Sequence, residues 1–219
     1  MTRMTRSAPE RLRVLGGRRA IVVPEAWRPL AAQVAALASL PISVELDTGE
    51  RTTDHVLRLA AVSPEPMLVL PSGEPPGGHE GVLAGALRKV LAPLDLTEEE
   101  GAVLARWIER ALDRGIGVEQ LHVLSPSSLP AMWEGPGHHA AAWRAEMFRR
   151  HRVDGSLLAL RSGDALQQIV SEAPHCDLLL VYWRGDPSRD RAGLVRSVLA
   201  EAPTPVLLVR EPPAPALAA

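Results

Sequence analysis

Short apolar runs alternate with segments of helical periodicity between residues 88 and 210. The apolar runs predict five strands, at 89–94, 118–124, 156–160, 177–183 and 205–209. The segments between them predict helices at 97–114, 138–152 and 192–201, and a turn and helix at 163–173. Regular alternation of strands and helices is typical of a parallel sheet with helices on both faces. The pattern therefore predicts an open α/β fold.

The helix predicted at 97–114 has clear start and stop signals. Thr97 can cap its N-terminus, and Glu100, three residues later, completes a capping box. Gly115 supplies the left-handed residue that often follows a helix. Apolar residues at three- and four-residue spacing predict one buried face: Val103, Leu104, Trp107, Ile108, Ala111 and Leu112. Asp95, just before this helix, stands at the carboxyl end of a predicted strand, where ligands of parallel sheets usually bind.

The first 87 residues contain a shorter version of the same alternation. Residues 18–25 resemble 88–95, residues 42–61 resemble 156–173, and residues 67–70 resemble the apolar strand that follows. We interpret 18–80 as a degenerate, shortened first half of a tandem protein, with an unrelated α/β appendage as the alternative. The Pro- and Gly-rich stretch 71–81 is a candidate linker, and 1–17 and 211–219 are predicted to be disordered.

Residues 88–210 resemble one complete universal stress protein domain. The matching segments are VLAPLD followed by a capping Thr, VEQLHVL, RSGDALQQIV, CDLLLV and VLAEAPTPVLLVR. Each is also common in other α/β proteins, so the resemblance rests on their order and spacing. It implies five parallel strands in the order 3-2-1-4-5 and, in many members, dimerisation. In one branch of the family it also implies ATP bound at the carboxyl ends of the strands.

The residues implied for contact with the nucleoside are present. Asp95 matches the acidic residue that meets the nucleotide near its ribose, and Pro93 belongs to the same motif. Val123 matches a position that contacts adenine. The alternative for Asp95 is a structural role, in which its carboxylate accepts hydrogen bonds from nearby N–H groups while Thr97 caps the helix.

The phosphate loop implied by the resemblance is incomplete. That loop reads Gly-x-x-Gly, nine residues, then Gly-Ser or Gly-Thr, and its backbone N–H groups hold the phosphates. Tyr182 stands at the first glycine position, Gly185 matches the second, and Ala192-Gly193 replaces the final pair after only six residues. Three arginines of this loop could hold phosphates by charge instead: Arg184, Arg189 and Arg191. The alternative is a solvated loop that Asp186 and Asp190 partly neutralise.

Composition limits the class of protein and its partners. The chain has 219 residues, and its 46% of hydrophobic residues is enough for a core. A net charge of −2, from 24 basic and 26 acidic residues, gives no general attraction to nucleic acid. No apolar run approaches the roughly 20 residues of a membrane span, and the N-terminus has no apolar core of a secretory signal. A single cysteine, Cys176, excludes an internal disulfide, so we expect a cytoplasmic protein.

Other chemical signals are weak. His138, His139 and His151 fall in one predicted helix, but adjacent histidines point in different directions and no further ligand stands at a suitable spacing, so we predict no metal site. Cys176 has no activating His or Lys nearby in the sequence and is interpreted as a structural thiol. His122, inside a predicted strand, is interpreted as a hydrogen-bonded histidine of the fold.

Two hypotheses for function follow. The first is a non-enzymatic stress-response or regulatory protein with a decayed ATP site, which acts by binding partners. The second is an adenine-nucleotide-binding protein, for ATP or AMP, that uses Asp95, Val123 and the loop 184–191 and hydrolyses its ligand slowly or not at all. The tentative nucleotide-binding residues are Pro93, Asp95, Val123, Arg184, Gly185 and Gly193.

The last predicted strand, 205–209, would lie at the edge of the sheet with an apolar sequence that must be covered. We therefore expect either a homodimer through this strand or its pairing with the N-terminal half of the same chain.

Overall fold

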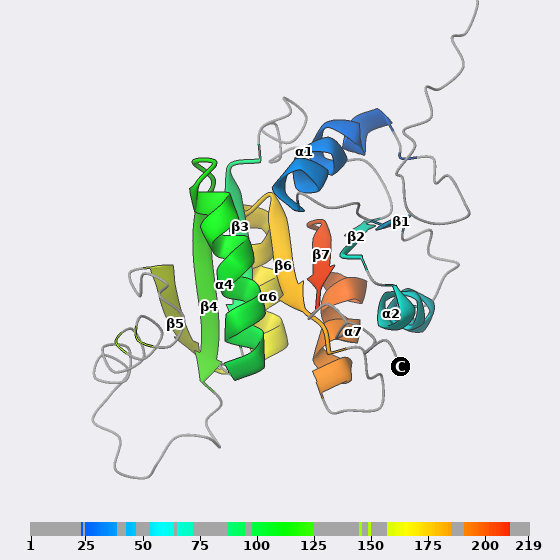
Figure 1. Cartoon of the computed structure of the whole chain (residues 1–219). Helices are drawn as coiled ribbons and strands as arrows, with labels where there is room; N and C mark the ends of the chain where they lie inside the picture. Colours follow the sequence, from blue (N-terminus) through cyan, green and yellow to red (C-terminus); the bar gives the residue numbers. More distant parts are fainter. Residues whose placement is uncertain are drawn as a thin grey trace, which may run out of the picture.

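Seven strands form one mixed sheet in the part of the chain that the computed structural model describes (Figure 1). The described residues are 23, 25–38, 43–46, 53–63, 65–71, 87–94, 98–124, 145, 149, 157–184 and 191–210. The strands are β1 (Ser43–Leu46), β2 (Met67–Leu70), β3 (Lys89–Leu94), β4 (Gly117–Leu124), β5 (Leu158–Ser162), β6 (Leu178–Tyr182) and β7 (Val206–Val209). The helices are η1 (Glu25–Trp27), α1 (Arg28–Ala38), α2 (Thr53–Val62), α4 (Glu98–Leu112), α6 (Ala165–Glu172), η4 (Ala173–His175) and α7 (Arg191–Glu201).

The strand order is β1-β2-β7-β6-β3-β4-β5. From β3 onward, this gives five parallel strands in the predicted order 3-2-1-4-5, which confirms that prediction. Because successive side chains of a strand point to opposite faces, each strand contributes to two apolar layers. One layer packs against α1 and α4, and the other packs against α2, α6 and α7. Helices therefore cover both faces, as predicted (Figure 1).

The helix boundaries follow the signals in the sequence. Gly115 adopts a φ of 72° three residues after α4 ends, so the predicted left-handed stop is present. Asp164 caps α6, because its Oδ1 accepts the Gln167 N–H at 2.9 Å. One predicted core position is wrong: Leu112, in the last turn of α4, is 41% exposed, whereas Ile108 and Ala111 just before it are buried. β5 also begins at Leu158, two residues later than predicted.

β7 is not an edge strand. β2 pairs with it in antiparallel fashion, with Met67 opposite Leu208 and Val69 opposite Val206. Of the two arrangements expected from the sequence, the structure therefore has the pairing within one chain. A homodimer through the free edge of β7 was the wrong expectation, because β2 already takes the hydrogen bonds of that edge.

Helix contacts also join the N-terminal elements to the rest of the molecule. Arg110 of α4 and Arg114, in the turn after α4, donate to the carbonyl oxygens of Ala38 and Ala36, at 2.8 and 3.0 Å. These carbonyls belong to the last turn of α1, where no intrahelical donor remains. On the other face, the Arg196 Nε of α7 lies 2.6 Å from the Asp54 Oδ1 of α2.

Two strand–helix–strand units meet at the β2–β7 contact. One is β1–α2–β2 and the other is β6–α7–β7, and the strands within each unit are parallel. Since β2 and β7 are antiparallel and α2 contacts α7, the two units face each other in an approximate two-fold arrangement. From the sequence, residues 42–61 resemble residues 156–173, which do not belong to the β6–α7–β7 unit. The tandem interpretation of the N-terminal half stays a prediction.

Several predictions lie outside the described residues. They include the strand at 18–25, the disordered ends and the linker 71–81 beyond Pro71. The helix predicted at 138–152 is described only at Ala145 and Arg149, both of which are helical.

Candidate functional site

The carboxyl ends of β3, β4 and β6 lie at one edge of the sheet, because these neighbouring strands are parallel. Pro93 is buried near the end of β3, opposite Leu121 of β4. Val123, near the end of β4, is half-buried and packs on the layer formed with α6 and α7. Side-chain alternation along the strands puts Pro93 and Val123 on this same face of the sheet. The structure thus places Pro93 and Val123, two tentative site residues, at the expected edge.

His122 connects two strands at this edge. Its Nδ1 lies 2.9 Å from the Leu94 carbonyl oxygen, which can only accept, so Nδ1 carries the proton and donates. The ring is half-buried. This confirms the interpretation of His122 as a hydrogen-bonded residue of the fold. Asp95, which follows Leu94, lies outside the described residues.

Two large aromatic residues occupy the start of the implied phosphate loop. Tyr182 ends β6 and is buried in the layer with α1 and α4, whereas Trp183 is buried in the layer with α2 and α7. The backbone N–H of Trp183 donates to the Val209 carbonyl oxygen at 2.7 Å. β6 thus keeps its sheet hydrogen bonding through the position where a glycine cradle would leave the sheet.

The indole of Trp183 has an unusual environment. Its Nε1 is fully buried and has no hydrogen-bond partner among the described residues, although the side chain as a whole is 3% exposed. A buried N–H without an acceptor costs roughly 1–3 kcal/mol. The next residue, Arg184, is exposed at the carboxyl edge. No motif in the sequence indicates that the Trp183 indole N–H is buried without an acceptor. The only signal is the place of Trp183 at the first variable position of the implied phosphate loop.

The remaining loop residues divide between described and undescribed positions. Gly185 and Arg189 lie outside the described residues. Gly193 lies in the first turn of α7, where a Cβ would meet no atom within 4 Å. Nothing in the described surroundings therefore requires glycine at this position. Of the tentative nucleotide-binding residues, Pro93, Val123, Arg184 and Gly193 have defined places, and Asp95 and Gly185 do not.

Cys176 is a buried thiol between η4 and β6. It is 3% exposed, and its Sγ–H donates to the Ala173 carbonyl oxygen at 3.2 Å. Burial raises the thiol pKa to about 12, so the group is neutral near pH 7. This environment agrees with a structural thiol. Among the described residues, no three His, Cys, Asp or Glu side chains gather as metal ligands would.

The opposite edge of the sheet contains a pocket that sequence reasoning missed. It has a volume of about 490 Å³ and lies at the amino ends of β3, β4 and β5. Its lining residues are Arg88, Lys89, Gly117, Val118, Glu119, Leu157, Leu158 and Ala159. The available signal was Glu119, the one acidic residue of the predicted strand 118–124.

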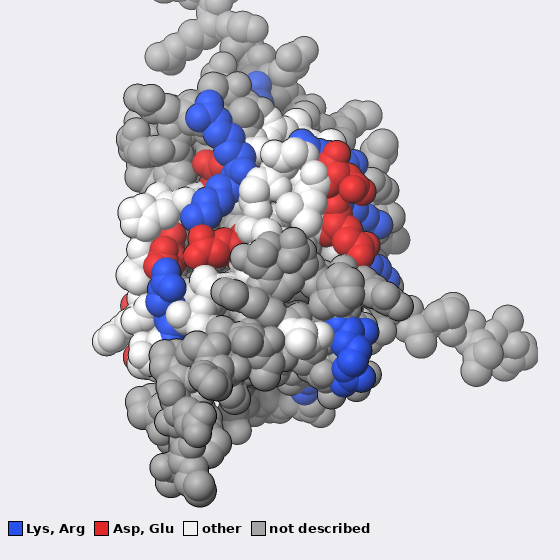
Figure 2. Space-filling view, turned by 90° about the vertical axis from the view of Figure 1, so that its left-hand side faces the viewer, with Lys and Arg blue, Asp and Glu red and all other residues white. Residues whose placement is uncertain are grey.

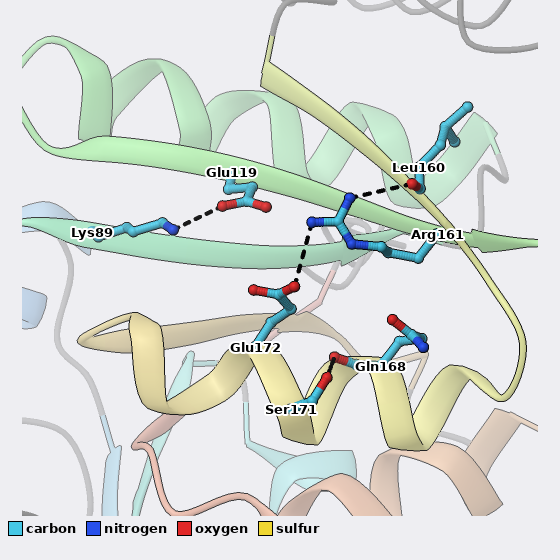
Figure 3. Close-up of polar contacts among 7 residues, drawn as sticks. All are labelled: Lys89, Glu119, Leu160, Arg161, Gln168, Ser171 and Glu172. Atoms are coloured by element: carbon cyan, nitrogen blue, oxygen red, sulfur yellow. Dashed lines mark hydrogen bonds and ion pairs between the residues drawn. The ribbon is translucent and has the colours of Figure 1, made fainter. Parts of the chain in front are cut away.

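Charged side chains of both signs lie on the α6 face next to this pocket (Figure 3). Lys89 Nζ of β3 lies 2.8 Å from Glu119 Oε2 of β4, and Arg161 of β5 lies 3.4 Å from Glu172 of α6. In the space-filling view of this side of the molecule, basic and acidic side chains lie in contact beside uncharged surface (Figure 2). None of the described helices is long and apolar enough to cross a membrane.

Comparisons with known proteins agree with this architecture. A universal stress protein of Archaeoglobus fulgidus is 12% identical with a TM-score of 0.53, and covers 84% of this chain and 66% of its own. A putative universal stress protein of Pseudomonas aeruginosa is 13% identical with a TM-score of 0.50, and covers 82% of this chain and 66% of its own. The chain thus spans just under two thirds of the length of these relatives.

A second A. fulgidus universal stress protein, solved in complex with dAMP, is 17% identical, has a TM-score of 0.38, and covers 56% of this chain and 96% of its own. No curated protein matches the chain in sequence. The sequence model of the universal stress protein family matches residues 86–210, which is more than half of the chain. The chain belongs to the universal stress protein family.

Proposed function

We propose that this chain is a non-enzymatic regulatory binding protein of the stress response whose nucleotide phosphate site has been lost. The observation that carries the proposal is the structure at Tyr182 and Trp183. Both side chains are buried, on opposite faces of the sheet, where the family's ATP-binding branch has a glycine loop.

A glycine cradle holds phosphates because its backbone comes close to the ligand with free N–H groups. Here the Trp183 N–H is already bonded to Val209, so it is not available to a phosphate. Turning it outward would also withdraw an aromatic side chain from the core, and removal of a buried aromatic costs about 3–5 kcal/mol. Phosphate binding at this position would therefore compete with the fold itself.

Isothermal titration of the whole chain with ATP, AMP and a cyclic dinucleotide, each with Mg²⁺, tests the proposal. We expect no binding at micromolar concentrations, from protein shown to be folded by circular dichroism and by a cooperative melt. Micromolar affinity for any of the three would overturn the proposal and make the carboxyl edge a working nucleotide site.

One observation favours the second candidate, an adenine-nucleotide-binding protein. Arg184, which follows β6, is exposed at the carboxyl edge. An exposed guanidinium at this edge could hold an anionic ligand without a glycine loop. In that case, Arg184→Gln and Asp95→Ala would each abolish binding without unfolding the chain.

A matched control for these variants is Arg106→Gln. Arg106 is also an exposed arginine, but it lies in the middle of α4, away from the carboxyl ends of the strands. A general loss of positive charge would weaken binding in both arginine variants, whereas a site at the carboxyl edge would respond only to Arg184. Unchanged affinity after both Arg184→Gln and Asp95→Ala would exclude this candidate.

The assembly proposal follows from the occupied β7 edge. We propose that the N-terminal elements take the place of a partner subunit at β7, so that any self-association uses another surface. Light scattering coupled to size-exclusion chromatography measures the mass in solution. A dimer that persists in the Val69→Asp variant of β2 would agree with self-association through another surface. A dimer that forms only in that variant would show that β7 can pair between chains.

A further inference from the structure

Three polar side chains are buried in the part of the chain that the structure describes: Glu100, Gln120 and Thr204. Thr204 Oγ1 donates to the Ala173 carbonyl oxygen at 2.6 Å, and Glu100 also has a partner. Gln120 differs, because it is 0% exposed and neither its Oε1 nor its Nε2 has a hydrogen-bond partner among the described residues. The other buried atoms in this condition are all N–H groups, so Gln120 alone leaves both a donor and an acceptor unpaired in the described residues.

Gln120 lies in the middle of β4, on the face of the sheet that packs against α1 and α4. Val118, two residues before it, belongs to that apolar layer, whereas Leu121 belongs to the layer on the other face. Its register partners are Ala92 of β3 and Leu158 of β5, and both are members of the same layer as Val118. The strands on either side therefore offer the Gln120 amide no polar side chain at this level of the sheet.

The chemistry of the amide limits what could bind to it. A buried amide that loses its hydrogen bonds to water and gains none in return destabilises the folded state, so a partner for Gln120 is favoured strongly. The apolar layer around it disfavours an ion, because a buried charge without a counter-charge is costly. A primary amide presents an N–H donor beside a carbonyl acceptor. One neutral molecule with an adjacent donor and acceptor therefore satisfies both groups at once.

We propose that the Gln120 amide binds a small neutral molecule, either water or a solute with an amide-like edge, between the sheet and α4. The molecule accepts a hydrogen bond from Nε2 and donates one to Oε1. Its place is on the β3 side of Gln120, where Ala92 has no side-chain atom beyond Cβ. The proposal does not depend on the proposed function, because this site lies in the middle of the sheet and not at its carboxyl edge.

A high-resolution crystal structure of the whole chain tests the site directly. We expect electron density within about 3.2 Å of both Gln120 Oε1 and Gln120 Nε2. A single spherical peak would identify water, whereas an extended peak, together with added mass in native mass spectrometry, would identify a solute of the same hydrogen-bonding chemistry. A well-defined Gln120 side chain with no density beside its amide would refute the proposal.

Thermal melts of Gln120→Met give an independent test, because methionine has a similar volume and no polar N–H or C=O group. If the amide had no bound partner, removal of two unpaired groups would raise Tm by about 4 °C or more. We expect any rise to stay below that value, because methionine also loses the bound molecule. The control is Gln167→Met on the exposed side of α6, which should change Tm by no more than about 2 °C. A rise of about 4 °C or more in Gln120→Met, with the control unchanged, refutes the proposal, and the crystallographic test stands alone if that variant does not fold.

Discussion

Replacement of Leu57 by alanine tests whether the N-terminal elements belong to the same cooperative unit as the family domain. Leu57 lies in α2, is 0% exposed, and packs in the apolar layer that also contains residues of β6, β7, α6 and α7. Leucine-to-alanine changes at such sites cost 2.7–5.0 kcal/mol in a well-studied series, so we expect a loss of about 3 kcal/mol. For a chain of this size that loss lowers Tm by about 6–12 °C.

The assay is urea and thermal denaturation followed by circular dichroism and by tryptophan fluorescence. Trp27, Trp107 and Trp183 are buried in different parts of the fold, so coincident curves would indicate one transition. The control is Val62→Ala in the same helix, at a site that is 77% exposed, with an expected change within about 0.5 kcal/mol. A separate early transition for Leu57→Ala, with the main transition unmoved, would refute the reasoning by showing that α2 unfolds independently.

Four further predictions concern charged and titratable groups. Cys176 should react slowly with iodoacetamide at about pH 8 in the folded chain and rapidly in urea, because its buried thiol is neutral. Because folding raises the Cys176 pKa, the free energy of unfolding should be unaffected by this thiol below pH 9.0 and should fall as the pH rises from there to about 12. Cys176→Ala should remove this fall in the free energy of unfolding. The raised Lys89 pKa gives a contribution that is complete below pH 10.5 and declines above it, and Lys89→Met should remove this decline at a neutral-pH cost of at most about 1 kcal/mol for so exposed a pair. A double-mutant cycle on Asp54 and Arg196 should give a coupling below about 1 kcal/mol that shrinks in high salt.

Local signals in the sequence predicted most of the fold between residues 88 and 210. The left-handed turn predicted at Gly115 and the turn into a helix predicted at 163–164 depend on nearby residues alone, and both are present. Leu112 shows the limit of periodicity, which identifies an apolar stripe on a helix but not the residue at which its burial ends.

Whether β2 pairs with β7 in parallel or antiparallel fashion could not be predicted from the sequence. The apolar sequences of both strands show only that they are buried, because a fully buried strand reads the same in parallel and antiparallel pairing. The match of residues 42–61 to 156–173 reflects the same ambiguity, since one strand–helix unit resembles another in composition. Which unit faces which is decided by contacts across the sheet, such as Asp54 with Arg196.

Some features of the candidate sites could likewise be predicted from the sequence, and others could not. Pro93 and Val123 were placed correctly at the carboxyl edge because strand ends follow from strand boundaries. The unsatisfied Trp183 indole and the pocket beside Arg88 depend on packing between distant segments, so no motif could reveal them. The polar Glu119 was the only local sign of the pocket.

The antiparallel junction also has a consequence for biosynthesis. β2 is translated long before β7, with residues 71–205 between them. Until β7 leaves the ribosome, one edge of β2 has no partner and the apolar stripe of α2 has no α7 to pack against. Pairings across such long sequence separations form late, and segments that wait for them are exposed to aggregation and to chaperones. During translation there is therefore a long interval in which β1, α2 and β2 have been synthesised but cannot yet pack into the complete sheet.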